Sequence, residues 1–258
     1  MDFRIGDRRA LVLCATEGIG RACALSLAHE CAEVTIVARN RDRLESTQTA
    51  LASETSAKIH TIAADVATQS GVATILSELP SPPDIIVLVP PRHGPPPVAP
   101  SGDDVEGQFL TELRCPLSLI EGLLPHMQSQ RWGRVVLLTG AAVKQPVGRL
   151  LPMAALRLAL IAYLRGMSQQ EAKCGITMNA VLIGYTDTPG LKRNWLTQAA
   201  EAGVSYEELL ARKLSESSIG RLGTPPEIAA LVTYLAGSQA GYVTGEVISC
   251  DGGRGGFV

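Results

Sequence analysis

The sequence predicts an α/β fold, a doubly wound parallel sheet of about seven strands with helices on both faces. Short, continuous apolar runs recur along the chain, which is typical of parallel strands buried on both faces. Each run is followed by a longer stretch of helical character, as in repeated strand–helix units. A glycine turn with Gly18 and Gly20 directly follows the first run. The expected strands span residues 10–14, 33–38, 58–63, 84–89, 134–138, 176–182 and 246–250.

Helical segments separate the expected strands. Right-handed crossovers through these segments make the predicted sheet Rossmann-like. Pro116 lies inside the segment from Val105 to Met127 and predicts a kink, because an interior proline loses a helical hydrogen bond. We expect residues 1–258 to form one domain, with residues 190–222 as a lid on the substrate side. The expected helices span residues 21–30, 41–53, 68–79, 105–127, 151–170, 191–214 and 226–236.

The bulk composition argues against several classes of protein. The 258 residues carry a net charge of −2 and are 46% hydrophobic, so there is no excess of basic residues for nucleic acid or an anionic membrane. No apolar run reaches the roughly 18 residues of a membrane span, and the N-terminus lacks the apolar core of a signal peptide. The six cysteines are scattered, which predicts neither disulfides nor a metal site. We therefore expect a cytoplasmic protein without a metal.

The glycine turn and the end of the second strand predict a dinucleotide site. Gly18 and Gly20 would let the backbone approach a pyrophosphate and let the next helix pack closely on its strand. Arg39 directly follows the second strand, where a positive side chain accommodates the 2′-phosphate of NADP(H). The alternative is that the glycines serve helix packing alone and that Arg39 belongs to a solvated basic turn.

A proline-rich stretch, PPRHGPPPVAP, follows the fourth strand at residues 90–100. Prolines fix φ and remove backbone donors, so we expect a stiff, extended loop. A loop at the carboxyl end of a parallel strand is expected to form one wall of the binding crevice. The alternative is a polyproline ligand for a partner protein. His93 in this loop is either a general acid or base near neutral pH or a surface residue.

Further short motifs carry a resemblance to a known family. GRVV at residues 133–136, GYTDTP at 184–189 and VTGEVISCDGG at 243–253 occur in the order and spacing of that family. With the glycine turn, Asp65-Val66 and LLPHM at 123–127, the resemblance covers residues 8–253. The chain resembles the short-chain dehydrogenase/reductase family. The resemblance implies a doubly wound sheet with a dinucleotide crevice at the carboxyl ends of its strands.

In that family a serine, a tyrosine, a lysine and an asparagine handle the substrate oxygen and its proton. By the resemblance, the serine position falls on Gly140, and Thr139 is the nearest hydroxyl. The tyrosine position falls on Met153, which has no titratable proton. The lysine and asparagine positions fall on Arg157 and Glu112. The sequence therefore departs from the family at all four catalytic positions.

The resemblance also implies cofactor contacts, and these are kept only in part. The first glycine of the family's turn falls on Cys14, and its NNAG motif falls on Leu88-Val89-Pro90-Pro91. Larger or more rigid residues at these positions would crowd the cofactor. NADP(H) is therefore a candidate cofactor, with no hydride transfer expected. The retained positions for adenine, ribose and phosphate contacts are Gly18, Gly20, Arg39, Asp65, Thr186 and Thr188.

The missing catalytic side chains favour a repurposed enzyme with a non-redox reaction. Cyclisation, isomerisation, dehydration or a related rearrangement would gain rate from orienting a flexible substrate. Apolar walls expected around the crevice favour a hydrophobic small molecule, such as an intermediate of secondary metabolism. Two alternatives stay open: an inactive partner subunit or ligand sensor, and an NADPH-dependent reductase with displaced catalytic groups. The candidate catalytic residues are Glu112, Arg157, Thr139, His93 and Tyr185.

Glu112 and Arg157 are the most informative of these substitutions. In the family their positions face each other across the floor of the site, so the two changes are expected to compensate as an ion pair. That pair is either a buried structural salt bridge or an acid/base or oxyanion-binding group. The helix from Leu151 and the C-terminal segment form subunit contacts in the family, which predicts a homo-oligomer, a dimer or a tetramer.

Overall fold

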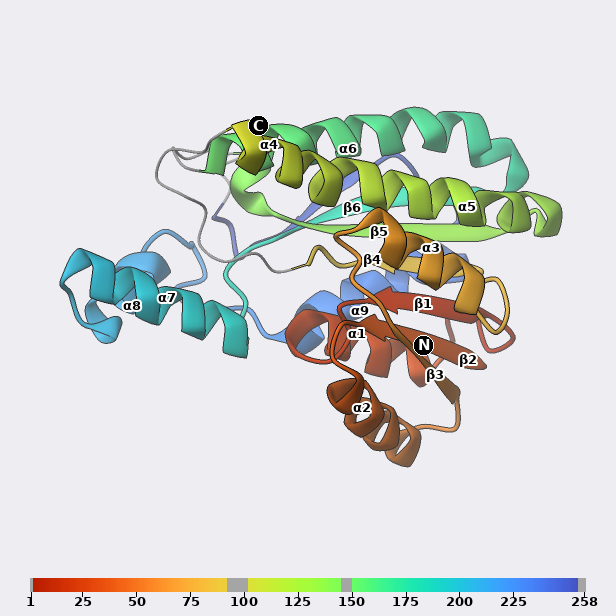
Figure 1. Cartoon of the computed structure of the whole chain (residues 1–258), viewed down its shortest axis with the longest axis horizontal. Helices are drawn as coiled ribbons and strands as arrows, with labels where there is room; N and C mark the ends of the chain where they lie inside the picture. Colours follow the sequence, from red (N-terminus) through yellow and green to blue (C-terminus); the bar gives the residue numbers. More distant parts are fainter. Residues whose placement is uncertain (1, 92–101, 145–149, 255–258) are drawn as a thin grey trace.

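The computed structural model describes residues 2–91, 102–144 and 150–254, and these contain one parallel sheet (Figure 1). Its strand order is β3-β2-β1-β4-β5-β6-β7, so the direction of winding reverses between β1 and β4. This is the switch point of a Rossmann-like sheet, and the predicted fold class is confirmed. The strands are β1 (Arg9–Leu13), β2 (Glu33–Ala38), β3 (Lys58–Ala63), β4 (Ile85–Leu88), β5 (Gly133–Gly140), β6 (Ile176–Ile183) and β7 (Val247–Cys250).

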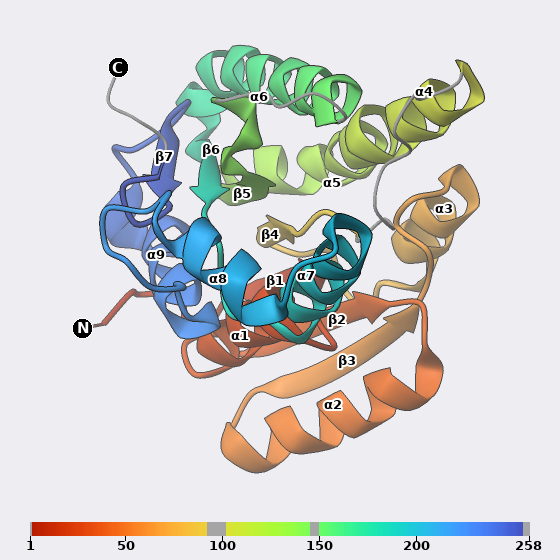
Figure 2. The same cartoon turned by 90° about the vertical axis from the view of Figure 1, so that its left-hand side faces the viewer.

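Different helices cover the two faces of the sheet (Figures 1 and 2). Successive side chains of a strand point to opposite faces, so each face has its own apolar core. Val12 and Val136 belong to one core, and Leu11 and Leu137 belong to the other. The first core is covered by α1 (Gly18–Ala28), α2 (Arg41–Glu54) and α9 (Pro225–Ala236), and the second by α3 (Gln69–Glu78), α5 (Cys115–Gln130) and α6 (Leu151–Glu171).

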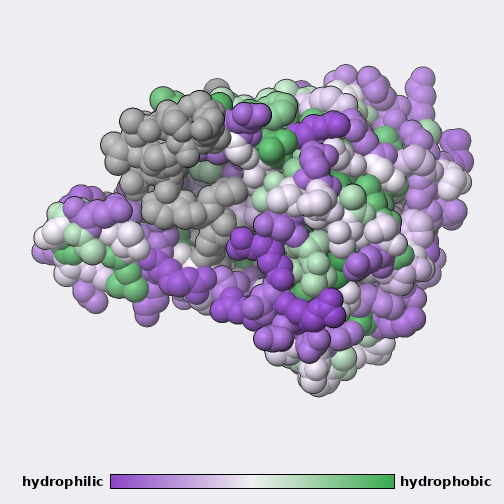
Figure 3. All heavy atoms as spheres, in the orientation of Figure 1, coloured by the Kyte–Doolittle hydropathy of each residue, from purple (hydrophilic) through white to green (hydrophobic). Residues whose placement is uncertain are grey.

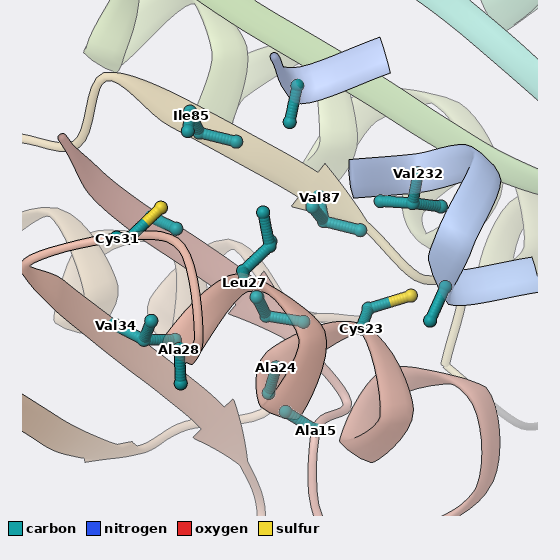
Figure 4. Close-up of a cluster of buried hydrophobic side chains, with 14 of the residues drawn as sticks. Ala15, Cys23, Ala24, Leu27, Ala28, Cys31, Val34, Ile85, Val87 and Val232 are labelled. Atoms are coloured by element: carbon teal, nitrogen blue, oxygen red, sulfur yellow. The ribbon is translucent and has the colours of Figure 1, made fainter. Parts of the chain in front are cut away.

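Helix α1 packs closely against the sheet. A Cβ at Gly20 would lie 2.3 Å from the carbonyl oxygen of Cys14, so only glycine fits between the helix and the turn that precedes it. Farther along α1, Cys23 and Leu27 share a buried cluster with Val87 of β4 and Val232 of α9 (Figure 4). These contacts hold the N-terminal end of α1 at the carboxyl end of β1, where a pyrophosphate binds in folds of this kind.

The segment from Val105 to Met127, predicted as one helix with a kink at Pro116, is built differently. Helix α4 (Gly102–Phe109) runs into a π-helical turn, Leu110–Arg114, and then into α5. The amide of Cys115 donates to the carbonyl of Leu110, one residue farther back than in an α-helix. Pro116 then stands in the first turn of α5, where its missing amide costs little. The predicted kink at Pro116 stays a prediction, and the π turn is a feature that the sequence did not indicate.

Two helices occupy most of the range predicted as a lid. They are α7 (Pro189–Ala202) and α8 (Tyr206–Leu214), which project beyond the carboxyl ends of the strands (Figures 1 and 2). The sequence predicts one helical stretch here, over residues 191–214. Gly203 in the left-handed region (φ +66°) ends α7, and a capping box of Ser205 and Glu208 begins α8. A role as a lid stays a prediction.

Apolar residues lie on the exposed side of α6. Leu151, Ala155, Leu158 and Ala162 are exposed and recur at helical spacing along this helix, which fits the predicted subunit contact without testing it. Neither α6 nor any other helix of the described ranges is long and apolar enough to cross a bilayer. Short 3-10 turns complete the described fold at Ala141–Val143, Ala172–Cys174 and Ser238–Ala240.

The close packing of α1 gives a testable expectation. Gly20→Ala forces a Cβ onto backbone atoms and should lower the free energy of unfolding by roughly 1–3 kcal/mol, the usual cost of overpacking. Gly166→Ala on α6 is the matched control, since a Cβ there meets nothing within 4 Å and should stabilise the helix by about 1 kcal/mol. Urea unfolding compares the two variants. Equal stabilities would contradict this account of the turn.

Candidate active site

An ion pair between the π turn and α6 forms the centre of the candidate site. Arg157 donates from Nε to Oε2 of Glu112 at 2.8 Å and from Nη2 to Oε1 at 3.0 Å. The Glu112 side chain is 3% exposed and that of Arg157 is 14% exposed. Two parallel bonds to a carboxylate fix the plane of the guanidinium as well as its position. The expected pairing is present, and its role as structure or chemistry stays open at this point.

The remaining guanidinium nitrogen faces the family's serine position. Gly140 is the last residue of β5, and a Cβ built there would lie 3.4 Å from Nη1 of Arg157. Within the described ranges, the hydrogen bonds of Arg157 use Nε and Nη2. A side chain at Gly140 would therefore occupy the space directly in front of Nη1.

A small cavity lies beside the ion pair, between the sheet and helices α5 and α6. Its volume is about 30 Å³, enough for roughly two water molecules at 10–15 Å³ each. Thr139 lines it together with Glu112 and Arg157, and most of the other walls are apolar. The Thr139 hydroxyl is buried and has no hydrogen-bond partner among the described residues. A buried hydroxyl without a partner is costly, so this one is suited to bind a water or a ligand atom.

Met153 stands one helical turn before Arg157 on α6 and is partly buried. Its thioether has no proton to transfer and accepts hydrogen bonds only weakly. The charged centre of the site is therefore the Glu112–Arg157 pair, with Thr139 as the adjacent hydroxyl.

The turn after β1 keeps the backbone form of a dinucleotide site. Cys14 has φ +52°, a left-handed conformation that favours glycine. Gly18 has φ +56°, and a Cβ there would lie 3.0 Å from Cγ2 of Thr188. Thr188 itself caps α7, because its Oγ1 accepts a hydrogen bond from the amide of Leu191. Cys14, at the position of the family's first glycine, therefore has a backbone conformation that glycine adopts readily.

The basic rim expected for a 2′-phosphate lies at the start of α2. Arg39 is exposed, and its Nη1 lies 3.9 Å from Oδ2 of Asp65. Strongly hydrophilic residues gather over this end of α2 on the face shown in Figure 3. Thr186, another of the retained positions, is buried and forms an isolated β-bridge with Gly223. The described residues thus fit the adenosine and phosphate half of the cofactor.

The positions expected near the nicotinamide, at the end of β4, carry other residue types than the family's NNAG motif. Leu88 ends β4 and is buried, and Val89, Pro90 and Pro91 follow it along the cavity wall. The two prolines provide no amide hydrogens, so only carbonyls and apolar surface remain at these positions. Apolar walls of this kind suit a hydrophobic ligand better than a charged one.

Tyr185 lies apart from the ion pair, in a second cavity of about 230 Å³ near the ends of β6 and β7. Its hydroxyl donates to Oε2 of Glu216 at 2.9 Å, and its ring packs edge-on against Trp195. Burial raises the pKa of the Tyr185 phenol, and the hydrogen bond to Glu216 acts in the same direction. The structure therefore does not bring Tyr185 together with Thr139 and Arg157. His93 lies outside the described residues.

A charged contact that the sequence did not indicate joins the turn after β1 to the expected lid. Glu17, which precedes α1, accepts a hydrogen bond from Nη2 of Arg193 on α7 at 2.6 Å and lies 3.5 Å from Nη1 of Arg43 on α2. Arg193 is 176 residues away in the sequence, so no local pattern could have indicated this pair. Among the described residues there is no group of three potential ligands for a metal ion.

The burial of the ion pair makes its loss costly. Glu112→Gln leaves the Arg157 guanidinium without its counter-charge and should lower the free energy of unfolding by about 3–5 kcal/mol. The double variant Glu112→Leu, Arg157→Met should recover most of that loss, because no buried charge remains. Arg21→Met, which breaks the exposed pair with Glu54, is the control and should cost about 1 kcal/mol at most. A Glu112→Gln protein as stable as this control would contradict the burial argument.

Comparisons with known proteins identify the relatives of the chain. A family model described as enoyl-(acyl carrier protein) reductase matches residues 14–254. The NADPH-dependent reductase BacG of Bacillus subtilis (strain 168) is 28% identical over 254 residues, which cover 96% of this chain and 98% of that protein. The 3-oxoacyl-[acyl-carrier-protein] reductase FabG of Aquifex aeolicus (strain VF5) is 25% identical over 258 residues, which cover 98% and 99%.

Solved structures of reductases also match the chain. The structure of YwfH, an NADPH-dependent reductase involved in bacilysin biosynthesis, matches with a TM-score of 0.90 and 26% identity, covering 98% of this chain and 100% of that one. A variant of actinorhodin polyketide ketoreductase with NADPH matches with a TM-score of 0.86 and 28% identity, covering 97% and 98%.

These relatives correct the functional prediction. They are named as reductases, so the prediction of a non-redox reaction is wrong. The prediction equated loss of the family's proton-handling side chains with loss of hydride transfer, yet the cofactor carries the hydride and the protein supplies its binding site. The alternative of an inactive subunit gains no support from these relatives. With a family model that matches residues 14–254, the chain belongs to the short-chain dehydrogenase/reductase family.

Proposed function

We propose that this chain is an NADPH-dependent reductase that acts on a hydrophobic small molecule. When bound, NADPH supplies the hydride. The chain's own residues bind and orient cofactor and substrate and stabilise the charge that develops on the substrate. The names of the relatives support this proposal, and it replaces the non-redox prediction.

One observation carries the proposal: Cys14, at the position of the family's first glycine, has the left-handed conformation that favours glycine, with φ +52°. A left-handed conformation costs a residue with a Cβ roughly 1–2 kcal/mol. Strain of this kind persists where the surrounding structure and function require it. The preserved turn is the element that approaches the pyrophosphate in folds of this kind.

The retained residues have defined roles in such a site. Gly18 and Gly20 would hold the pyrophosphate at the N-terminus of α1, where the helix dipole favours a negative charge. Arg39 would pair with the 2′-phosphate, and Asp65 would accept a hydrogen bond from the adenine. Arg157, at the family's lysine position, would place a permanent positive charge beside the nicotinamide ribose.

The substrate class follows from the walls around the ion pair. Leu88, Val89, Pro90 and Leu138 line the cavity beside Glu112 and Arg157. That cavity, of about 30 Å³, is too small for a substrate, and we place it at the floor of the binding site. An apolar floor with a single charged pair favours a hydrophobic molecule that carries one polar reacting group.

Cofactor binding tests this proposal. We expect calorimetry of the purified protein to show NADPH binding more tightly than NADH, because only NADPH offers a 2′-phosphate to Arg39. Arg39→Met should weaken NADPH binding by roughly tenfold to a hundredfold, the range for a hydrogen bond to a charged group, and leave NADH binding unchanged. Arg165→Met, an exposed arginine on α6, is the control. Absence of NADPH binding at millimolar concentration would overturn the proposal.

A further inference from the structure

We infer that Glu17 couples the binding of NADPH to the position of α7 and α8. Its carboxylate holds α7 against the turn after β1, and holds it more firmly once Arg43 has turned from Glu17 to the 2′-phosphate of the cofactor. This inference rests on the proposed reductase function and adds a response that NADH would not produce. Glu17 is a positioning residue, since it acts on α7 through Arg193.

Helices α7 and α8 form a unit with a small apolar core of its own. Trp195, Ala199 and Leu209 are buried together, apart from the two cores that flank the sheet. The chain enters and leaves this unit side by side, where Thr186 and Gly223 form a parallel β-bridge. The two helices project beyond the carboxyl ends of the strands (Figures 1 and 2). A unit of this kind can shift relative to the sheet without losing its internal packing.

Two contacts join the first half of α7 to the turn after β1. Gly18 lies against Thr188, because a Cβ built on Gly18 would be 3.0 Å from Cγ2 of that threonine. Farther along α7, Nη2 of Arg193 donates to Oε1 of Glu17 at 2.6 Å. The first contact limits how closely the two elements approach, whereas the second attracts them to each other. The Glu17–Arg193 contact therefore decides how firmly α7 is held at the turn.

The Glu17 carboxylate is shared between two arginines. Its Oε1 accepts a hydrogen bond from Arg193, and its Oε2 lies 3.5 Å from Nη1 of Arg43 at the start of α2. The side chains of Arg193 and Arg43 are 57% and 62% exposed, and two like charges that converge on one carboxylate repel each other. The contact with Arg43 is the longer of the two, so it yields first to a competing anion.

The 2′-phosphate of NADPH is such an anion. Arg39, its proposed partner, and Arg43 both stand at the start of α2, on either side of Asn40, which caps that helix by accepting from the amide of Arg43 at 2.8 Å. A phosphate monoester carries about −1.5 to −2 charges at pH 7, more than the single charge of a carboxylate. Arg43 therefore turns from Glu17 to the 2′-phosphate when NADPH is bound.

Loss of Arg43 from the shared carboxylate strengthens the contact between Glu17 and Arg193. The repulsion between the two arginines is removed, and less of the carboxylate's charge is neutralised by a second cation. Helix α7 is therefore held more firmly against the turn with NADPH bound than with NADH, which has no 2′-phosphate. A charge at the adenosine end of the cofactor thus affects the helices expected to form the lid.

Amide hydrogen exchange of α7, followed by mass spectrometry, tests the shared carboxylate in the protein without cofactor. We expect Glu17→Gln and Arg193→Met each to speed exchange in α7 by about twofold to fivefold, as for loss of an exposed ion pair. Arg43→Met should have the opposite effect and slow exchange in α7, because the Arg43 charge competes for Glu17. Lys192→Met, which removes an exposed charge from the same helix, is the control and should leave exchange unchanged.

The direction of the Arg43→Met effect is decisive for the shared carboxylate. Exchange in α7 that is unchanged or faster in this variant overturns the inference, since Arg43 would then not compete with Arg193. A Glu17→Gln protein that exchanges like the Lys192→Met control overturns it as well, because α7 would not depend on the carboxylate.

The same measurement at saturating NADPH and at saturating NADH tests the link to the cofactor. We expect slower exchange in α7 with NADPH than with NADH in the unchanged protein, and no difference between the two cofactors in the Glu17→Gln protein. A difference that survives Glu17→Gln, or equal exchange with the two cofactors in the unchanged protein, overturns the inference alone. Absence of NADPH binding is a separate result, which overturns the reductase proposal and with it the link to the cofactor.

Discussion

The bidentate contact between Arg157 and Glu112 is the constraint on which the candidate site depends. It joins α6 to the π turn before α5, and both helices cover the same face of the sheet. A guanidinium buried beside apolar side chains is tolerated only with its counter-charge in place. The same two bonds that satisfy this charge also fix Nη1 towards Gly140. The stability of the site and its proposed chemistry therefore depend on one contact. The residues Glu112, Gly140 and Arg157 are compatible with one another as a set.

The turn after β1 combines a changed residue with a conformation that glycine favours. Cys14 stands at the position of the family's first glycine, and its backbone is in the left-handed region. Gly20, packed against the Cys14 carbonyl, holds this turn from the other side. Glu17 links the turn to α7 through Arg193. The turn after β1 is thus held by backbone packing and one side-chain contact, whereas the Glu112–Arg157 ion pair is the charged centre of the candidate site.

The sequence was sufficient for the fold because hydrophobic runs and glycine positions depend on local spacing. It also indicated that Glu112 and Arg157 would pair, since their positions correspond to facing residues in the family. It could not indicate the π turn, which arises where α4 runs into α5 and depends on a single shifted hydrogen bond. Nor could it place Tyr185 in a separate cavity or give the direction of Nη1, because these depend on packing between distant elements. The functional error had another origin: loss of the family's proton-handling side chains was equated with loss of hydride transfer, although the cofactor carries the hydride.

Deuterium transfer tests the central claim most directly. The protein would be supplied with NADPH deuterated at the transferable position and with matched pairs of conjugated and isolated carbonyl compounds, and the products analysed by mass spectrometry. We predict deuterium in the reduced product of at least one of these compounds. No deuterium transfer to any of them by protein that binds NADPH would contradict the account of this chain as a reductase.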